Sequence, residues 1–139
     1  MSFREAVNSG KFLITCEVGP PKGVGVEPVL EEAELLKDRV DGVNVTDLQA
    51  ACMRVSSLSA CVLLKQRGAE PIMQMVCRDR NRIALQSELL SAYVLGIRNV
   101  LCLTGDHVVL GDQLEAKPVF DLDSVSLLRA AQGLIEGHD

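Results

Sequence analysis

The sequence has few aromatic residues: it contains no tryptophan, one tyrosine and three phenylalanines in 139 residues. Proteins that bind single-stranded nucleic acid stack bases on aromatic side chains, so this scarcity disfavours that class. The net charge of −5 and the scattered basic residues disfavour a nucleic-acid partner as well. We therefore expect an aliphatic core and no nucleic-acid partner.

The sequence also lacks a long hydrophobic run. Its apolar runs are of strand length, far short of the roughly 20 residues that a membrane-spanning helix needs. The first ten residues include Arg4 and Glu5 and contain no apolar signal region. We expect a cytoplasmic protein without a membrane partner, with residues 1–139 forming a single domain of ordinary size.

Cysteine pairs at metal-binding or redox spacing are missing. The five cysteines contain no CxxC pair, and only two histidines are present to complete a zinc site. The odd number fits free thiols in a reducing compartment. Cys16, Cys77 and Cys102 lie inside or at the end of apolar runs, where cysteine usually acts as a small buried hydrophobe. We predict no metal site.

What the sequence does contain is an alternation of two kinds of segment. Short apolar runs typical of strands covered on both faces alternate with longer segments of helical period. The predicted strands are 11–18, 42–47, 70–77 and 98–106, and the predicted helices are 27–39, 56–68, 82–96 and 123–137. Gly68 and Gly96 are predicted to end two of the helices. The order βαβαβαβα predicts an α/β fold of (βα) repeats with parallel strands.

Polar residues gather where the predicted strands end. They are Glu17, Thr46, Asp47, Gln74, Cys77, Asp79, Thr104, Gly105 and Asp106. The carboxyl ends of parallel strands are where α/β folds bind ligands. The 107–122 connection that follows is long enough to predict a ligand loop or lid, with a plain exposed insertion as the alternative.

Glu17 is the unusual residue, because it interrupts an apolar run just before the Gly-Pro-Pro-Lys-Gly turn of residues 19–23. Apolar surroundings would keep its carboxyl protonated near neutral pH, as a general acid requires. The alternative is an ion pair with Lys22 or Arg54. At the last strand end, Gly105 would let a flat ligand approach the backbone and Asp106 could accept hydrogen bonds, although Thr-Gly-Asp is also common turn chemistry. No GxGxxG or GxxxxGK phosphate-binding motif is present.

Taken in order, the segments TCEVGPPKG, NVTD, PIMQMVCRDRNR, GIRNVLCLTGD and AKPVFDLDSVSLL resemble the methylenetetrahydrofolate reductase family over nearly the whole chain. Members of that family are flavin-containing (β/α)8 barrels of one-carbon metabolism and methionine biosynthesis. They reduce 5,10-methylenetetrahydrofolate to 5-methyltetrahydrofolate.

The resemblance implies roles for particular residues. Glu17 stands in the place of the general acid that opens the five-membered ring of the folate to a reactive iminium. Asp106 stands in the place of the aspartate near the flavin pyrimidine edge and the folate pterin. The resemblance implies an FAD or FMN site lined by Thr46, Gln74, Leu103, Thr104, Gly105, Asp106 and Phe120. Many members carry arginine at the position of Thr104 and histidine at that of Gln74, so this chain lacks two charges there.

A complete (β/α)8 barrel takes about 250 residues, so this chain would supply the first half of a TIM-type barrel, as a fragment or a half-barrel form. The implied partners are the folate substrate, NAD(P)H or a reductase partner protein, and either a second copy or a missing C-terminal half. Two other functions fit the pattern: a non-catalytic folate- or flavin-binding scaffold of the same fold, and a folate-dependent methyltransferase barrel. Keeping both Glu17 and Asp106 favours the reductase.

Overall fold

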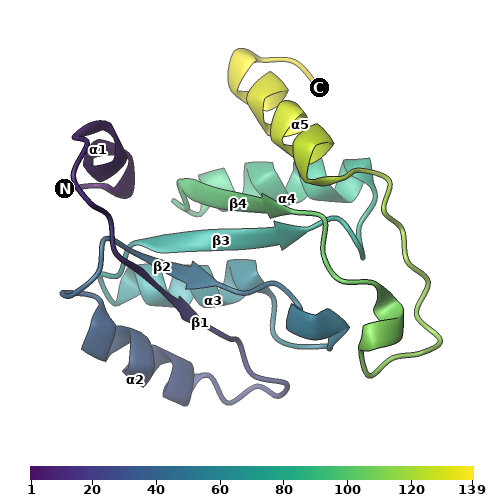
Figure 1. Ribbon diagram of the computed structural model, residues 1–139, viewed down its shortest axis with the longest axis horizontal. Helices are drawn as coiled ribbons and strands as arrows, with labels where there is room; N and C mark the ends of the chain where they lie inside the picture. The colour runs from purple at the N-terminus through teal and green to yellow at the C-terminus, as the bar shows by residue number, and fades with distance from the viewer.

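The computed structural model describes all 139 residues as strands alternating with helices (Figure 1). The four strands are β1 (Thr15–Val18), β2 (Gly42–Val45), β3 (Pro71–Val76) and β4 (Asn99–Leu103). The helices are α1 (Phe3–Asn8), α2 (Glu27–Leu36), α3 (Ser57–Gln66), α4 (Arg82–Val94) and α5 (Ser124–Glu136), and two short 3-10 helices are η1 (Gln49–Ala51) and η2 (Val108–Leu110).

The strands form one parallel sheet in the order β1-β2-β3-β4. Val18 is in register with Val45, and Val45 with Met73. The predicted α/β fold of (βα) repeats is therefore confirmed, with each strand shorter than expected. The polar residues predicted at the strand ends lie just beyond the strands, except Glu17 and Gln74, which lie within β1 and β3.

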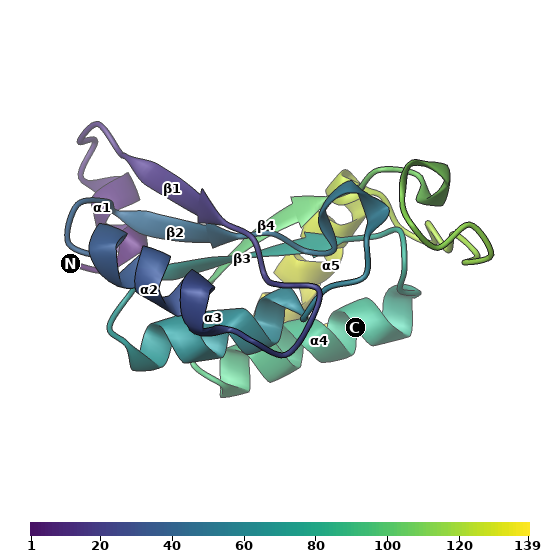
Figure 2. The same ribbon diagram turned by 90° about the horizontal axis from the view of Figure 1, so that it is seen from below.

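One face of the sheet is covered by helices. Figure 2 shows α2, α3 and α4 together on one side of the strands. Alternate strand residues face these helices and form an aliphatic core that includes Val18, Val45, Met73 and Met75. The expected aliphatic core is confirmed, since no aromatic side chain belongs to this cluster.

Cysteines take part in this core as small apolar residues. Cys61 and Cys77 are fully buried, and Cys16 and Cys102 pack against the core from the strands. Burial raises the pKa of all four thiols, and that of Cys61 reaches about 12. These thiols are therefore protonated and unreactive near neutral pH.

The opposite face of the sheet is open, which corrects the prediction that the strands are covered on both faces. No helix lies over its centre in Figure 2. Glu17 and Leu101 point to this side and are exposed, although all six residues of the central β3 are buried. The apolar runs therefore reflect burial within the sheet and on one face of it.

The helices begin and end where local chemistry dictates. The side chains of Ser56, Asn81 and Asp123 accept backbone N–H groups at the first turns of α3, α4 and α5. Gly68 and Gly96 follow α3 and α4 with φ of +83° and +84°, as predicted for glycine after a helix.

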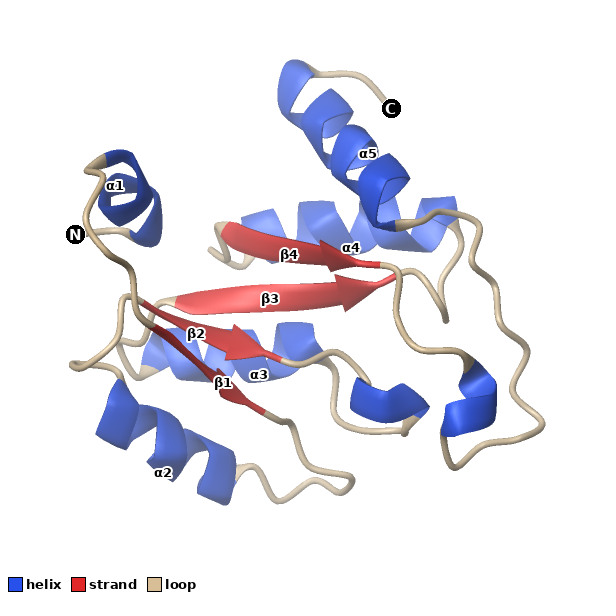
Figure 3. Cartoon of the chain, viewed as in Figure 1, coloured by secondary structure: helices blue, strands red, loops and turns tan.

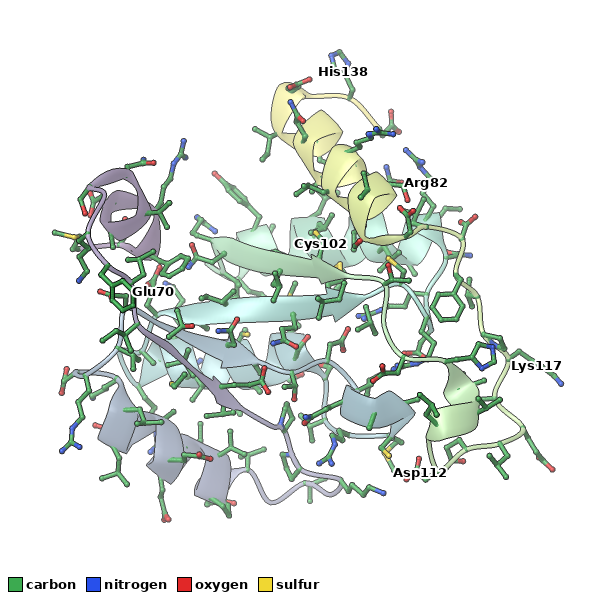
Figure 4. All side chains as sticks on the ribbon, viewed as in Figure 1. Glu70, Arg82, Cys102, Asp112, Lys117 and His138 are labelled. Carbon is green, nitrogen blue, oxygen red and sulfur yellow. The ribbon has the colours of Figure 1, made fainter.

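Helix α1 was not anticipated from the sequence. Ser2 and Glu5 form a capping box that starts it, and its Ala6 is buried. The Phe3 N–H donates to Glu70 Oε1 over 3.5 Å, which ties α1 to the amino-terminal end of the sheet, where Figure 4 labels Glu70. None of the helices has the length and apolar character needed to cross a membrane.

Candidate active site

Three loops meet at the carboxyl edge of the sheet. The β2–α3 loop with η1 and the β4–α5 loop with η2 lie side by side at the right of Figure 3. They approach so closely that a Cβ on Gly111 would overlap the Ala51 carbonyl oxygen. Only glycine fits there, because a side chain would have to displace the backbone of the other loop.

Asp112, labelled in Figure 4, ties these loops to the turn after β1. Its carboxylate accepts a 2.5 Å hydrogen bond from Lys22 Nζ and a 3.4 Å bond from the Met53 N–H. The bond from Lys22 lowers the pKa of Asp112, and the same bond raises the pKa of Lys22. The 107–122 connection is therefore fastened to both neighbouring loops.

The backbone of these loops is strained. Four non-glycine residues have positive φ: Leu48 (+49°), Ala50 (+56°), Ala51 (+56°) and Phe120 (+42°). All four lie in the connections after β2 and β4. Such conformations cost about 1–3 kcal/mol each and are concentrated at functional sites.

Glu17 occupies neither of the environments that the sequence suggested. Its side chain is exposed on the open face, and its Oε2 accepts a 2.9 Å hydrogen bond from Gln74 Nε2. The alternative ion pair is absent, because Lys22 binds Asp112 and Arg54 donates to the Pro20 carbonyl over 3.1 Å. The apolar surroundings are absent because nothing covers this face. The structure instead joins two predicted site residues, Glu17 and Gln74.

Thr46 offers an unused hydroxyl beside this pair. The residue is 3% exposed, and its Oγ1 is buried without a hydrogen-bond partner. Gly19 lies against it, since a Cβ at that position would lie 3.6 Å from Oγ1. A buried unpaired hydroxyl beside a bare backbone suits a flat ligand with hydrogen-bonding edges, such as an isoalloxazine ring.

The end of β4 presents its backbone rather than its side chains. Leu103 is half-buried, and the Thr104 hydroxyl accepts a 3.1 Å hydrogen bond from the Ser124 N–H at the start of α5. Gly105 has φ +93°, and a Cβ on it would lie 3.0 Å from the Cβ of Val76. Asp106 is exposed, and its carboxylate makes no hydrogen bond or ion pair within the chain. It is therefore free to bind a ligand.

Phe120 returns from the long loop toward this strand end. Its ring stacks on His107, with centroids 6.0 Å apart and planes at 21°. The neighbouring Val119 N–H donates to the Arg78 carbonyl over 2.7 Å. The predicted residues thus form two groups: Glu17, Thr46 and Gln74 on the β1–β3 side, and Thr104 to Asp106 with Phe120 beyond β4.

Sequence reasoning named Asp47 among the strand-end polar residues but missed Arg78 and Arg80, the basic residues behind this edge. Asp47 is buried, accepts the Val76 N–H over 2.9 Å and pairs with Arg80, which also bonds Glu88. Arg78 is 2% exposed. Both arginines lie in the stretch CRDRNR, where the density of charge by itself indicates no specific role. A better signal is that Arg78 continues the alternation of β3, on the same side as Gln74.

The chain has no group of three or more His, Cys, Asp or Glu side chains placed to hold a metal ion. The donors at the carboxyl edge are hydroxyl, amide, carboxylate and main-chain groups. They suit an organic ligand.

Comparison with known proteins gives the family. A search of curated proteins finds no match to the chain. A family model described as methylenetetrahydrofolate reductase matches residues 2–135, nearly the whole chain. The match agrees with the TIM-barrel fold of that family, of which four parallel βα units are the repeating part, and supports an oxidoreductase-like enzyme. The chain belongs to the methylenetetrahydrofolate reductase family.

Proposed function

We propose that the chain takes part in the flavin-dependent reduction of 5,10-methylenetetrahydrofolate to 5-methyltetrahydrofolate. The observation that carries the proposal is the hydrogen-bonded pair Glu17–Gln74 beside the unpaired Thr46 hydroxyl, at the carboxyl edge of a sheet from this family. A non-catalytic scaffold would need none of these groups in this arrangement.

Glu17 is proposed as the proton donor to the folate. Gln74 fixes Oε2 with its 2.9 Å hydrogen bond, which leaves Oε1 to carry a proton toward a ligand on the open face. Opening a five-membered ring requires protonation of the departing nitrogen, and a positioned carboxyl contributes about 10²–10⁴-fold to such a step. Gln74 is proposed to orient this carboxyl without adding a charge.

The flavin, when bound, supplies the hydride. Thr46 is proposed to donate its free hydroxyl to the flavin, and the Leu103–Gly105 segment to present its main chain to the ring. Asp106 is proposed to accept hydrogen bonds from ring N–H groups, since its carboxylate has no partner in the chain. Phe120, already stacked on His107, is proposed to add an aromatic contact.

The open face calls for a cover, because a proton donor works best where water is excluded. We propose that the second half of the barrel covers Glu17, supplied by a second copy of the chain or by a C-terminal segment. NAD(P)H or a reductase partner protein is proposed to supply electrons. The free edges of β1 and β4 are suited to strand pairing with the cover.

The first test is the visible absorption spectrum of the purified chain after FAD or FMN is added and the excess is removed. The molecular mass in solution is measured alongside. A bound flavin spectrum is expected. A well-folded chain without flavin, both as monomer and as dimer, would mean that these four βα units do not make the cofactor site.

The second test is Glu17→Gln on the flavin-loaded protein. Folate reduction is expected to fall about 10²–10⁴-fold while oxidation of the electron donor by the flavin continues. Glu31→Gln, on the exposed side of α2, is the matched control and should change neither half-reaction. Loss of both half-reactions in Glu17→Gln would assign Glu17 a structural role instead.

A further inference from the structure

Arg78 is a charged side chain buried at the carboxyl edge, where only 2% of it is exposed, and its hydrogen-bonding groups are nearly all used. Its guanidinium makes four hydrogen bonds: two to the Asp79 carboxylate, of 2.9 and 2.8 Å, one to the Asp106 carbonyl of 3.0 Å, and one to the Leu48 carbonyl of 3.1 Å. An arginine side chain offers five N–H donors, so one remains.

These bonds join the loops of the candidate site. Asp106 follows β4, and Leu48 follows β2 with a strained φ of +49°. The main chain of Arg78 also accepts the Val119 N–H over 2.7 Å, next to Phe120. A single side chain, that of Arg78 after β3, therefore holds the backbone of the loops that follow β2 and β4.

Stability alone is a poor reason for this arrangement. Arg78 is buried, whereas the Asp79 carboxylate that it pairs with is 31% exposed, so the pair recovers little more than the desolvation cost of the guanidinium. What only arginine supplies is a planar fork that reaches two carbonyl groups and a carboxylate at once. Lysine would keep the charge but could not hold these three acceptors in fixed directions.

We propose that Arg78 is a positioning residue that fixes the main chain of Asp106 and of Leu48, and thereby the placement of the Asp106 carboxylate toward the ligand. The role of Asp106 in this proposal rests on the proposed function. The hydrogen bonds from Arg78 to the Asp106 and Leu48 carbonyl groups, called the Arg78 clamp below, do not depend on it. In this role Arg78 acts through Asp106, whose carbonyl group it binds.

The clamp is tested first on the free chain by hydrogen exchange measured with mass spectrometry. Arg78→Lys should speed amide exchange about 10–100-fold in segments 105–110 and 48–52, which corresponds to the loss of hydrogen bonds to a charged group. Arg67→Lys, an exposed residue whose side chain bonds nothing, is the control and should leave both segments unchanged. If Arg78→Lys does not fold, as judged by its urea unfolding curve, the neutral Arg78→Gln replaces it.

The role toward Asp106 is tested on the flavin-loaded protein by a double-mutant cycle with Asp106→Asn. Arg78→Lys should shift the flavin midpoint potential in the same direction as Asp106→Asn and lower kcat for folate about tenfold or more. In the Asp106→Asn background, the same substitution should have little further effect.

The outcomes separate the Arg78 clamp from the positioning role toward Asp106. Unchanged exchange in segment 105–110 would overturn the clamp. Faster exchange with equal effects in both backgrounds would show that Arg78 is structural only and overturn the positioning role. If the parent chain binds no flavin, the proposed function fails, and the exchange data alone decide whether Arg78 fixes Asp106.

Discussion

The two faces of the sheet use the same four strands for opposite purposes. On the covered face, Met73 and Met75 are fully buried among aliphatic side chains and protonated thiols. On the open face, Glu17 and Gln74 bond each other and Thr46 keeps an unpaired hydroxyl. Because side chains alternate along a strand, one residue step separates a core position from a candidate catalytic position.

The comparison teaches that stability and chemistry can be changed separately in this chain. Substitutions toward the helices should act on the free energy of unfolding. Substitutions of side chains on the open face should act mainly on ligand binding and turnover. The four predictions below test this division, from the largest expected effect to the smallest.

Met73→Ala should destabilise the chain by about 2–5 kcal/mol, because it leaves a cavity in the middle of the covered face. Leu101→Ala, on the open face where the side chain is 41% exposed, should cost about 1 kcal/mol or less. Urea unfolding curves measure both values. Equal losses would mean that the open face is packed in solution.

Gly105→Ala should destabilise by about 1–3 kcal/mol, since a Cβ at φ +93° would also lie 3.0 Å from the Val76 Cβ. Gly23→Ala is the matched control, because nothing lies within 4 Å of its Cβ position. The same unfolding experiment compares them. A loss at Gly23 as large as that at Gly105 would contradict the close packing of the β4 end on β3.

The covered face should make the chain sensitive to alkali. Burial raises the pKa of Cys61 from its ordinary 9.0 to about 12, so the folded state keeps a proton that the unfolded chain releases. Stability from this thiol is complete below pH 9 and is lost between pH 9 and about 12, by up to about 1.4 kcal/mol per pH unit.

Unfolding curves at stepped pH measure this slope, and Cys61→Ala should make it shallower. An unchanged slope in that variant would mean that Cys61 does not contribute. The remaining slope is expected to include Cys16, Cys77 and Cys102, whose pKa values burial also raises, and Lys22, whose pKa is raised by its bond to Asp112.

Lys22→Met should leave the unfolding midpoint unchanged, because exposed ion pairs contribute little to stability. It should nevertheless speed thermolysin cleavage within 107–122, where Lys22 holds Asp112 and where Val109, Leu110 and Leu114 are exposed. Lys11→Met, which breaks the pair with Asp41 at the other end of the sheet, should not affect that cleavage. Equal cleavage in both variants and the parent would remove Lys22 as a fastening point.

Much of the fold could be predicted from the sequence, because its signals are local. The apolar runs located the strands, and Gly68 and Gly96 marked helix ends whose positive φ only glycine adopts easily. Helix α1 was not predicted, because its six residues bury a single alanine and show no apolar stripe. Burial on both faces was overestimated, because a buried central strand and an edge strand look alike in sequence.

The candidate site was predictable in its residues but not in their partners. Glu17 and Gln74 are 57 residues apart in sequence, and nothing local indicates that they bond. The same holds for Arg78, whose acceptors Leu48 and Asp106 lie 30 and 28 positions away. Leu48, Ala50 and Ala51 adopt positive φ although none of them is glycine, and no turn motif in the sequence reveals this.

The strand order β1-β2-β3-β4 has a consequence for how the chain acquires its structure. Each strand pairs with the one made just before it, so every pairing closes only the intervening βα segment. Such low contact order favours fast folding, and on the ribosome each new strand can add to an edge already formed. Until the next strand emerges from the ribosome, the last strand made remains an unpaired edge to which that strand will bind. The order of synthesis therefore sets the order in which the strands pair.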